Sequence, residues 1–233
     1  MASKVCVVTG VGPGTGVACV RKFAAEGYRV AMLARSAEKL EALAAEIPGA
    51  HPYPTDVTVA ANVAATFARV RHELGRAEVL IHNAGNAVFG DVLTVTAEQL
   101  EDAWRVNVLG LFLCAREAIP DMQAEGHGTI LVTGATASLR GSIPMAAFAP
   151  AKGAQRLLAQ SMARRLGPDG IHVALAVIDG VIDMPVTRGF LPDRPDHFFL
   201  QPSAIADAYF AVAAQDRSAW TFEFDLRPFG EKW

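Results

Sequence analysis

The sequence predicts an α/β protein in which a doubly wound, mostly parallel sheet carries helices on both of its faces. Short apolar runs of strand length alternate with amphipathic helical patterns along nearly the whole chain. A glycine-rich turn joins the first apolar run to the first helical pattern. Because repeated strand–helix units bury a parallel sheet between two helical layers, this alternation indicates the doubly wound arrangement. The chain shows no internal repeat or linker, and we expect residues 1–233 to form a single domain.

The first half of the chain is expected to contain four strands and three helices. The apolar run at residues 5–8 has the length of a strand buried on both faces, and a helical pattern from about residue 17 ends at Gly27. Ser36 has the side chain and the position to cap the second helix. The other elements are a strand at 29–34, a helix end at Pro48 and Gly49, a strand at 51–54, a helix closed by Gly75 and a strand at 79–81.

The second half continues the alternation. Thr96 and Gln99 have capping-box spacing, which predicts the start of a long helical stretch over 96–122. Ser203 is expected to cap the last helix. Residues 180–202 hold four prolines and mixed charge, which favour a long loop or lid. The other elements are strands at 128–133, 171–178 and 220–226 and an alanine-rich helix at 146–166, whose first turns Pro150 is expected to disturb.

Composition and charge narrow the classes of function. With 52% hydrophobic residues the chain can build a substantial core, whereas a net charge of -3 without a basic cluster argues against a nucleic-acid partner. No apolar run reaches membrane-spanning length and the first is too short for a signal peptide, so we expect a cytoplasmic protein without a membrane partner. The histidines show no metal-ligand spacing, and we expect no metal site. The three cysteines are far apart and indicate buried thiols in a reducing compartment: Cys6, Cys19 and Cys114.

The turn after the first strand has the composition of a phosphate-binding loop. Gly10, Gly12, Gly14 and Gly16 alternate with other residues between the strand and the first helix. At such a turn backbone N–H groups point at an anion, the helix dipole favours its charge, and the missing side chains allow a close approach. A tight turn without a ligand is the simpler alternative, but four glycines at this spacing favour a dinucleotide.

Five motifs follow one another along the chain. They are T-G-x-x-x-G-x-G at 9–16, Asp56 after the third strand, H-N-A-G at 82–85, Asn107 in the long helical stretch and Lys152 in the alanine-rich helix. Together these motifs resemble the short-chain dehydrogenase/reductase family. The resemblance implies a Rossmann-type sheet of seven strands, a nicotinamide cofactor, a small-molecule substrate and carbonyl/alcohol chemistry.

The resemblance also implies which residues bind the cofactor. The turn would hold the pyrophosphate, Asp56 would contact the adenine, Lys152 would bind the nicotinamide ribose, and Ile182 would meet the nicotinamide carboxamide through its backbone. Asp179 stands where the family usually has a proline before this last segment. The implied residues are Gly10, Gly12, Gly14, Thr15, Gly16, Asp56, Val57, Asn83, Ala84, Gly85, Lys152 and Ile182.

The end of the second strand distinguishes between the two nicotinamide cofactors. An NAD site needs a carboxylate about 20 residues past the glycines, to accept a hydrogen bond from the ribose 2′-hydroxyl. The sequence has Ala34 there, followed by Arg35. A guanidinium binds a 2′-phosphate through two hydrogen bonds and has no comparable partner in NAD. Arg35 therefore favours NADP(H) over NAD(H), the alternative being a solvated charge at the start of a helix.

The catalytic positions depart from the family pattern. The family's acid is a tyrosine four residues before the lysine, with a serine thirteen residues ahead of it, and these positions hold Phe148 and Ala135. A general acid contributes roughly 10²–10⁴ in rate and one oxyanion donor about 10²–10³. The tyrosines of the chain are expected on elements far from the site: Tyr28, Tyr53 and Tyr209.

Three polar residues are the remaining catalytic candidates. In the family the residue matching Asn107 holds a water of a proton relay, although an ordinary helix-kink amide is the simpler interpretation. Without the tyrosine, Lys152 could itself donate a proton through water. Ser138 lies three residues past the serine position, so a shift of the loop could bring it in.

Two classes of function therefore stay open. The first is an NADP(H)-dependent oxidoreductase with a non-standard proton donor, favoured by the otherwise complete dehydrogenase layout. The second is a catalytically inactive NADP(H)-binding sensor or interaction protein, favoured by the two missing catalytic side chains. We also expect a homodimer or homotetramer, because the helical stretches at 96–122 and 146–166 carry apolar residues on more than one face and the chain ends with Phe229 and Trp233.

Overall fold

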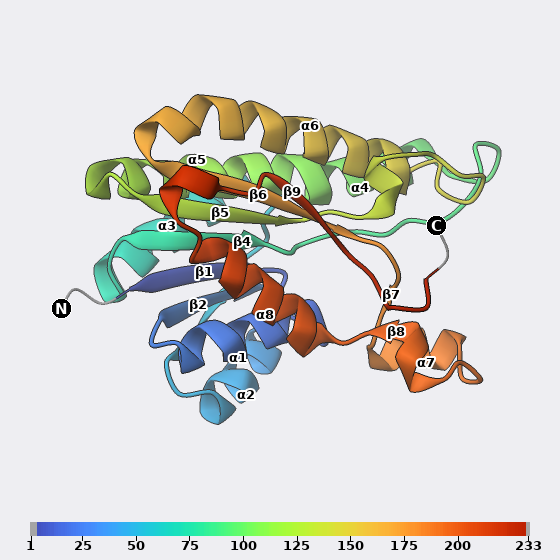
Figure 1. Ribbon diagram of the computed structural model, residues 1–233, viewed down its shortest axis with the longest axis horizontal. Coiled ribbons are helices and arrows are strands. Elements are labelled where there is room, and N and C mark those ends of the chain that lie inside the picture. Colours follow the sequence, from blue (N-terminus) through green and yellow to red (C-terminus); the bar gives the residue numbers. More distant parts are fainter. Residues whose placement is uncertain (1–3, 232–233) are drawn as a thin grey trace.

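Seven mostly apolar runs pair into one sheet in the computed structural model, which describes residues 4–231 (Figure 1). The strand order is β3-β2-β1-β4-β5-β6-β9, and every neighbouring pair is parallel. The predicted doubly wound α/β fold is confirmed, with a sheet that is wholly parallel. The strands are β1 (Val5–Thr9), β2 (Arg29–Ala34), β3 (Ala50–Pro54), β4 (Ala77–His82), β5 (Gly128–Thr133), β6 (Ile171–Ile178) and β9 (Glu223–Leu226).

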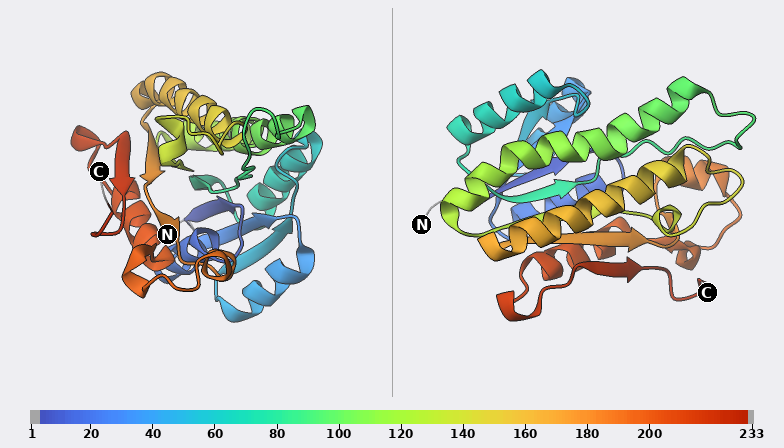
Figure 2. Two further views of the ribbon diagram at one scale, coloured as in Figure 1. Left: turned by 90° about the vertical axis from the view of Figure 1, so that its right-hand side faces the viewer. Right: turned by 90° about the horizontal axis from the view of Figure 1, so that it is seen from above.

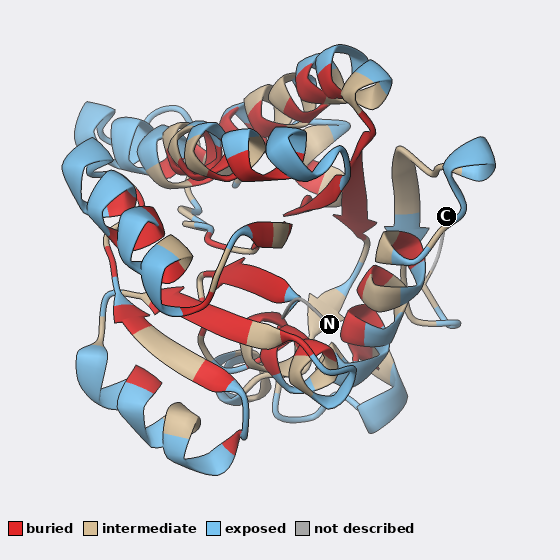
Figure 3. Ribbon diagram, turned by 90° about the vertical axis from the view of Figure 1, so that its left-hand side faces the viewer, coloured by how far each residue is buried: buried red, intermediate tan, exposed pale blue. Residues whose placement is uncertain are grey.

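The sheet separates two hydrophobic cores, because successive residues of a strand face opposite sides. In β1, Val5 and Val7 enter one core, and Cys6 and Val8 enter the other. Helices α3, α5 and α6 cover the first core, and α1, α2 and α8 the second (Figures 1 and 2). In Figure 3 buried residues follow the strands and the inner helix faces. These helices are α1 (Thr15–Ala25), α2 (Ala37–Glu46), α3 (Ala60–Glu73), α5 (Gly110–Glu125), α6 (Phe148–Leu166) and α8 (Pro202–Ala213).

Two of the three predicted helix caps are confirmed. The Ser36 hydroxyl accepts a hydrogen bond from the Lys39 N–H, and Thr96 and Gln99 form a reciprocal capping box. The Ser203 cap is wrong, since α8 begins one residue earlier, at Pro202. Proline suits the first helical position because its φ is already helical and its missing N–H would have no intrahelical partner there.

The helical stretch predicted at 96–122 is divided. α4 (Ala97–Trp104) runs through a π-helical turn (Arg105–Leu109) into α5. Asn107 lies within this turn, fully buried, and its side-chain amide donates hydrogen bonds to the carbonyls of Ala103 at 2.8 Å and Asn86 at 3.0 Å. Turns of this kind recur at functional sites. The π-helical turn is therefore tied to the segment that follows β4.

α6 begins at Phe148, slightly later than predicted. Pro150 occupies its first turn, where no intrahelical hydrogen bond is lost by the missing N–H. Phe148 and Lys152 both lie in the first two turns of α6.

The loop predicted at 180–202 contains short elements instead. β7 (Val181–Ile182) pairs in parallel with β8 (Phe199–Leu200), and α7 (Pro185–Phe190) lies between them. The Arg188 guanidinium donates to both oxygens of the Asp183 carboxylate, at 2.7 and 2.8 Å, and lies 4.0 Å over the Phe199 ring. Residues 183–201, called the lid segment below, are therefore folded on themselves.

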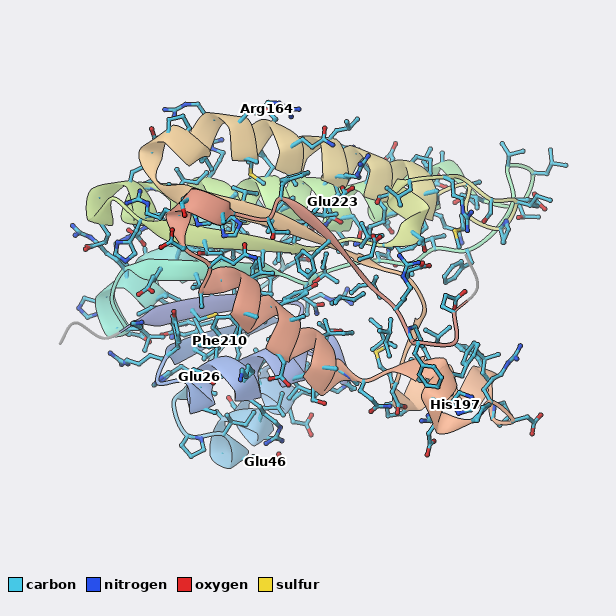
Figure 4. The ribbon with its side chains drawn as sticks, in the orientation of Figure 1. Glu26, Glu46, Arg164, His197, Phe210 and Glu223 are labelled. Carbon is cyan, nitrogen blue, oxygen red and sulfur yellow. The ribbon has the colours of Figure 1, made fainter. Side chains whose placement is uncertain are left out.

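α8 packs against α1 on the outer side of the second core. The rings of Phe23 and Phe210 meet edge to face at 5.4 Å, and Lys22 forms ion pairs with Glu26 and Asp207. Figure 4 labels Phe210 and Glu26 at this contact. Within residues 4–231, no helix is long and apolar enough to cross a membrane.

The connections after β1 and β4 leave toward opposite helical layers although the two strands are neighbours. A crevice opens at such a switch point, at the carboxyl ends of the strands. The loops after β4 and β5 and the lid segment lie at this end of the sheet, on the right in Figure 1. The fold therefore places its candidate site there.

Replacing Gly16 by alanine is expected to destabilise the fold. A Cβ atom on Gly16 would lie 2.5 Å from the Gly10 carbonyl oxygen, which cannot yield without moving the turn. Such overpacking costs ~1–3 kcal/mol. Gly12→Ala is the matched control, because a Cβ atom there meets nothing within 4 Å. Thermal unfolding measures both, and equal melting temperatures for the two variants would contradict this account.

Candidate active site

The glycine-rich turn lies directly against the end of β4. A Cβ atom on Gly10 would come within 2.5 Å of the Ala84 backbone. Gly10 and Gly14 also have φ angles of 70° and 98°, which favour glycine. The Asn83 side-chain amide donates a hydrogen bond to the Gly10 carbonyl at 3.0 Å and secures the contact. Close approach, as well as backbone conformation, therefore requires these glycines.

The N-terminus of α1 offers groups that fit a pyrophosphate. Gly14 supplies no side-chain cap, and the first turn holds no acidic residue. The Thr15 hydroxyl is buried and has no hydrogen-bond partner within residues 4–231. The turn is open at Gly12. An anion there would accept hydrogen bonds from the Thr15 hydroxyl and from the backbone N–H groups of the first turn. The helix dipole would also favour its negative charge.

A cleft of about 590 Å³ extends from this turn past the ends of β2 and β3. Asp56 lies in it, and hydrogen bonds from the Thr58 backbone N–H and hydroxyl lower the pKa of its carboxyl. The charges of Arg35 and Arg105 lower this pKa further. The predicted cofactor residues that line the cleft are Gly10, Gly12, Arg35, Asp56, Val57, Ala84 and Gly85.

Three cationic side chains border this cleft: Arg35, Lys39 and Arg105. Ala34 ends β2 without a carboxylate, as the sequence showed. Of these three cations, only Arg35 was predicted from the sequence. Lys39 could have been found from the Ser36 cap, which places it in the first turn of α2, whereas no local signal marks Arg105. The cluster gives the cleft a positive side suited to a phosphate.

Lys152 is buried at the inner end of the site. Its ammonium donates hydrogen bonds to the Thr133 carbonyl at 2.8 Å and to Gln155 Oε1 at 2.9 Å. Burial lowers the pKa of Lys152 to about 7. Gln155 in turn donates to the Asn107 backbone carbonyl at 2.9 Å. The lysine is thus connected to both β5 and the π-helical turn.

Two predicted catalytic groups converge on Gly85, next to the cleft. A Cβ atom on Gly85 would lie 3.2 Å from Asn107 Oδ1 and 3.7 Å from Lys152 Nζ. Asn107 Oδ1 is buried and has no hydrogen-bond partner among the described residues. A free acceptor and an ammonium therefore face the same small space.

Phe148 lies beside the lysine. Its ring centroid is 5.7 Å from Lys152 Nζ and 5.9 Å from the centroid of Phe89. Ala135 follows the end of β5 and precedes a 3₁₀ turn (Thr136–Ser138). An aromatic pair, without a hydroxyl, therefore occupies the side of the lysine where the family pattern has its tyrosine.

The expectation that all three tyrosines lie far from the site is wrong for Tyr209. Its hydroxyl donates to Thr133 Oγ1 at 2.9 Å, and Thr133 Oγ1 donates to Asn83 Oδ1 at 3.1 Å. α8 packs on the second core, so a long side chain from it reaches the end of β5. Tyr209 is fully buried, which raises the pKa of its phenol well above the ordinary value. Tyr209 therefore stabilises the position of Thr133 from the second core.

Ser138 lies apart from this group. Its hydroxyl is buried with no hydrogen-bond partner in the described chain, and it borders a separate hollow of about 400 Å³ with Ala137, Arg140 and Ala149. None of the residues around that hollow lines the cleft beside the glycine-rich turn.

His82, at the end of β4, lies 3.1 Å from Thr9 Oγ1 through its Nδ1. Burial lowers its pKa to about 3, and the charge of Lys152 lowers it too, so the imidazole stays neutral. Within residues 4–231 no cluster of three metal-ligating side chains occurs.

The segment after β6 closes over the glycine-rich turn. Met184, which the sequence did not single out, has its sulfur 2.6 Å from the position of a Cβ on Gly14, and Ile182 lies beside it. Asp179 stands in place of the expected proline, and its N–H donates to the Leu226 carbonyl at 2.8 Å, a bond that proline could not form. The Ile182 carbonyl accepts a hydrogen bond from Thr187 at 2.6 Å.

Comparison with known proteins identifies relatives for nearly the whole chain. Residues 4–194 match the family described as short chain dehydrogenase. The chain is 35% identical over 204 residues to 2-(R)-hydroxypropyl-CoM dehydrogenase of Xanthobacter autotrophicus, covering 83% of this chain and 80% of that protein.

Solved structures with the same fold cover the chain almost completely. A short-chain dehydrogenase from Rhodopseudomonas palustris is 36% identical with a TM-score of 0.83, over 98% of this chain and 100% of that one. An alcohol dehydrogenase from the archaeon Thermococcus sibiricus, complexed with 5-hydroxy-NADP, is 25% identical with a TM-score of 0.88, over 99% and 98% of the two chains.

Proposed function

The chain belongs to the short-chain dehydrogenase family, and on that premise we propose that it is an NADP(H)-dependent oxidoreductase that interconverts a small carbonyl compound and its alcohol. The observation that carries this proposal is the convergence of Lys152 and Asn107 on Gly85, beside a cleft with a cationic side. The dehydrogenases among its relatives, one of them complexed with an NADP derivative, support the same chemistry.

Two regions of the site would bind different parts of the cofactor. The glycine-rich turn and Thr15 would hold the pyrophosphate, and Arg35, with Lys39 and Arg105 beside it, would hold the 2′-phosphate. Asp56 would accept a hydrogen bond from the adenine amino group, since its carboxyl stays ionised. When bound, NADPH supplies the hydride that reduces a carbonyl carbon.

Lys152 is our proposed proton donor in place of the missing phenol. With a pKa of about 7, Lys152 is partly protonated at neutral pH. A general acid is most effective when its pKa lies near the working pH. The Lys152 proton would reach the developing alkoxide directly or through a water held by Asn107 Oδ1, which lacks a protein partner in the described chain. Ser138 stays the second candidate donor, although it borders a different hollow.

The second candidate function is an inactive NADP(H)-binding sensor or interaction protein. The contact between Phe89 and Phe148 favours it, because an aromatic pair fills the acid's place without supplying a proton. Absorbance measurements of NADPH oxidation over a panel of aldehydes, ketones, quinones and enones distinguish the two functions, since a sensor would bind NADPH and oxidise none of it.

NADPH is expected to bind at least tenfold more tightly than NADH, a difference of about 1.4 kcal/mol. Arg35→Ala should remove most of this preference, because the guanidinium has a partner only in the 2′-phosphate. Arg164→Ala is the control, since this side chain lies on the outer face of α6, away from the cleft (Figure 4). Calorimetry gives the affinities, and equal values for both cofactors with wild type would end the assignment.

Phe148→Tyr combined with Ala135→Ser should raise NADPH-dependent reduction of an activated ketone by about 10² or more. The new phenol would lie near Lys152, whose charge lowers a phenol's pKa, and the serine would hold the substrate oxygen. Phe148→Tyr alone should give much of the gain.

Steady-state rates decide between three outcomes for this double variant. The expected gain supports the proposed site. Ordinary dehydrogenase rates in wild type would show that another group already supplies the proton. A double variant that binds NADPH and stays inert would favour the sensor.

We also propose a homodimer or homotetramer assembled through α4 and α6. A hollow of about 500 Å³ between these helices is lined by Leu100, Trp104 and Pro150, and Leu157 on α6 is 63% exposed. Phe229 is exposed as well, while Trp233 lies outside the described residues. Such apolar surface is typical of an interface.

Light scattering at micromolar concentration should therefore show a dimer or tetramer. Leu157→Glu should shift it toward the monomer, since a buried unpaired carboxylate is costly. Leu93→Glu, on the exposed loop after β4, is the matched control and should leave the assembly intact. A monomeric wild type would refute the proposed assembly.

A further inference from the structure

Gln155 and Lys152 are the two polar side chains among the buried residues of α6, whose other buried side chains are small or apolar. Gln155 is fully buried on the inner face of α6, where Ala151, Ala159 and Met162 are its buried neighbours along the helix. A buried amide without partners is costly, so its two polar ends need hydrogen bonds. Gln155 Oε1 accepts from Lys152 Nζ at 2.9 Å, and Nε2 donates to the Asn107 carbonyl at 2.9 Å.

These two bonds link three separate elements of the site. Lys152 belongs to α6, Asn107 to the π-helical turn, and the second acceptor of the lysine, the Thr133 carbonyl, to β5. An ammonium has three N–H donors. Two of them are taken by Thr133 and Gln155, which leaves one for a ligand next to Gly85.

We propose that Gln155 is a positioning residue: its side-chain amide holds the Lys152 ammonium beside Gly85, which lines the cleft, and ties it to the π-helical turn that carries Asn107. An apolar side chain of similar size would fill the same space but would leave the lysine with a single protein acceptor. The inference deepens the proposed function, and it rests on that function only for the activity measurement described below.

The chemistry of the acceptor at position 155 also determines how readily Lys152 keeps its charge. A neutral amide oxygen stabilises the ammonium moderately, whereas a carboxylate would stabilise it strongly and an apolar group not at all. The other groups near the lysine do not compete for this role. His82 is neutral because burial lowers its pKa, and the phenol of Tyr209 stays protonated because burial raises its pKa. Arg105 and Asp102 line the cleft, and neither is a hydrogen-bond partner of Lys152 within residues 4–231.

The test measures the titration of Lys152 in the cofactor-free protein, by NMR of protein labelled with ¹³C at the lysine ε-carbon. Lys152→Met assigns the signal by its loss. Gln155→Glu should raise the Lys152 pKa, and Gln155→Met should lower it, each by about one unit or more. Both replacements keep the length of the side chain, so at least one folded variant is expected.

Tyr209→Phe is the matched control. It removes a buried hydroxyl that donates to the Thr133 side chain, whereas Lys152 donates to the Thr133 backbone carbonyl, so the ammonium keeps both of its protein acceptors. It should lower the melting temperature and leave the Lys152 titration in place. A Lys152 pKa that is unchanged in the folded Gln155 variants, or that moves equally in Tyr209→Phe, would overturn the proposal.

The activity measurement has a defined sign. If protonated Lys152 is the acid in carbonyl reduction, the rate falls as pH rises through its pKa. Gln155→Glu should move this fall to higher pH and Gln155→Met to lower pH. Because the titration needs no turnover, the two proposals fail separately. A shifted lysine without NADPH oxidation would refute the oxidoreductase alone, and turnover with an unshifted lysine would refute the role of Gln155 alone.

Discussion

The close approach of the glycine-rich turn to the end of β4 connects the turn to the polar contacts around Lys152. Because Gly10 and Gly16 carry no side chains, the Asn83 amide can reach the Gly10 carbonyl. Asn83 then accepts a hydrogen bond from Thr133, whose carbonyl holds Lys152. The members of such a buried network cannot be replaced singly without leaving a polar atom unpaired. The turn and the lysine, although distant in sequence, are therefore connected through Asn83 and Thr133.

Burial also gives the site its chemistry. A lysine in water carries its charge throughout the neutral range, but desolvation brings the pKa of Lys152 to about 7. The Phe148 ring, with its centroid 5.7 Å from Lys152 Nζ, keeps the surroundings of the lysine apolar on that side.

The sheet and the glycine-rich turn could be predicted because their signals are local. Apolar runs, caps and glycine spacing each lie within a few residues, and β2, β5 and β6 have the expected bounds. Contacts between distant elements leave no such signal. Nothing in the pattern of α8 shows that the Tyr209 hydroxyl reaches β5, and Gln155 resembles any other polar residue of an alanine-rich helix. The strands β7 and β8 are two residues long, too short to show a period.

The tail that follows β9 packs on the connection between β6 and β7 and reaches the lid segment. Pro228 occupies the space that a side chain on Gly180 would need, and the ring of Phe229 lies 5.8 Å from that of His197 in the lid. Local unfolding of the lid segment therefore removes the ring contact that His197 makes with Phe229 of the tail.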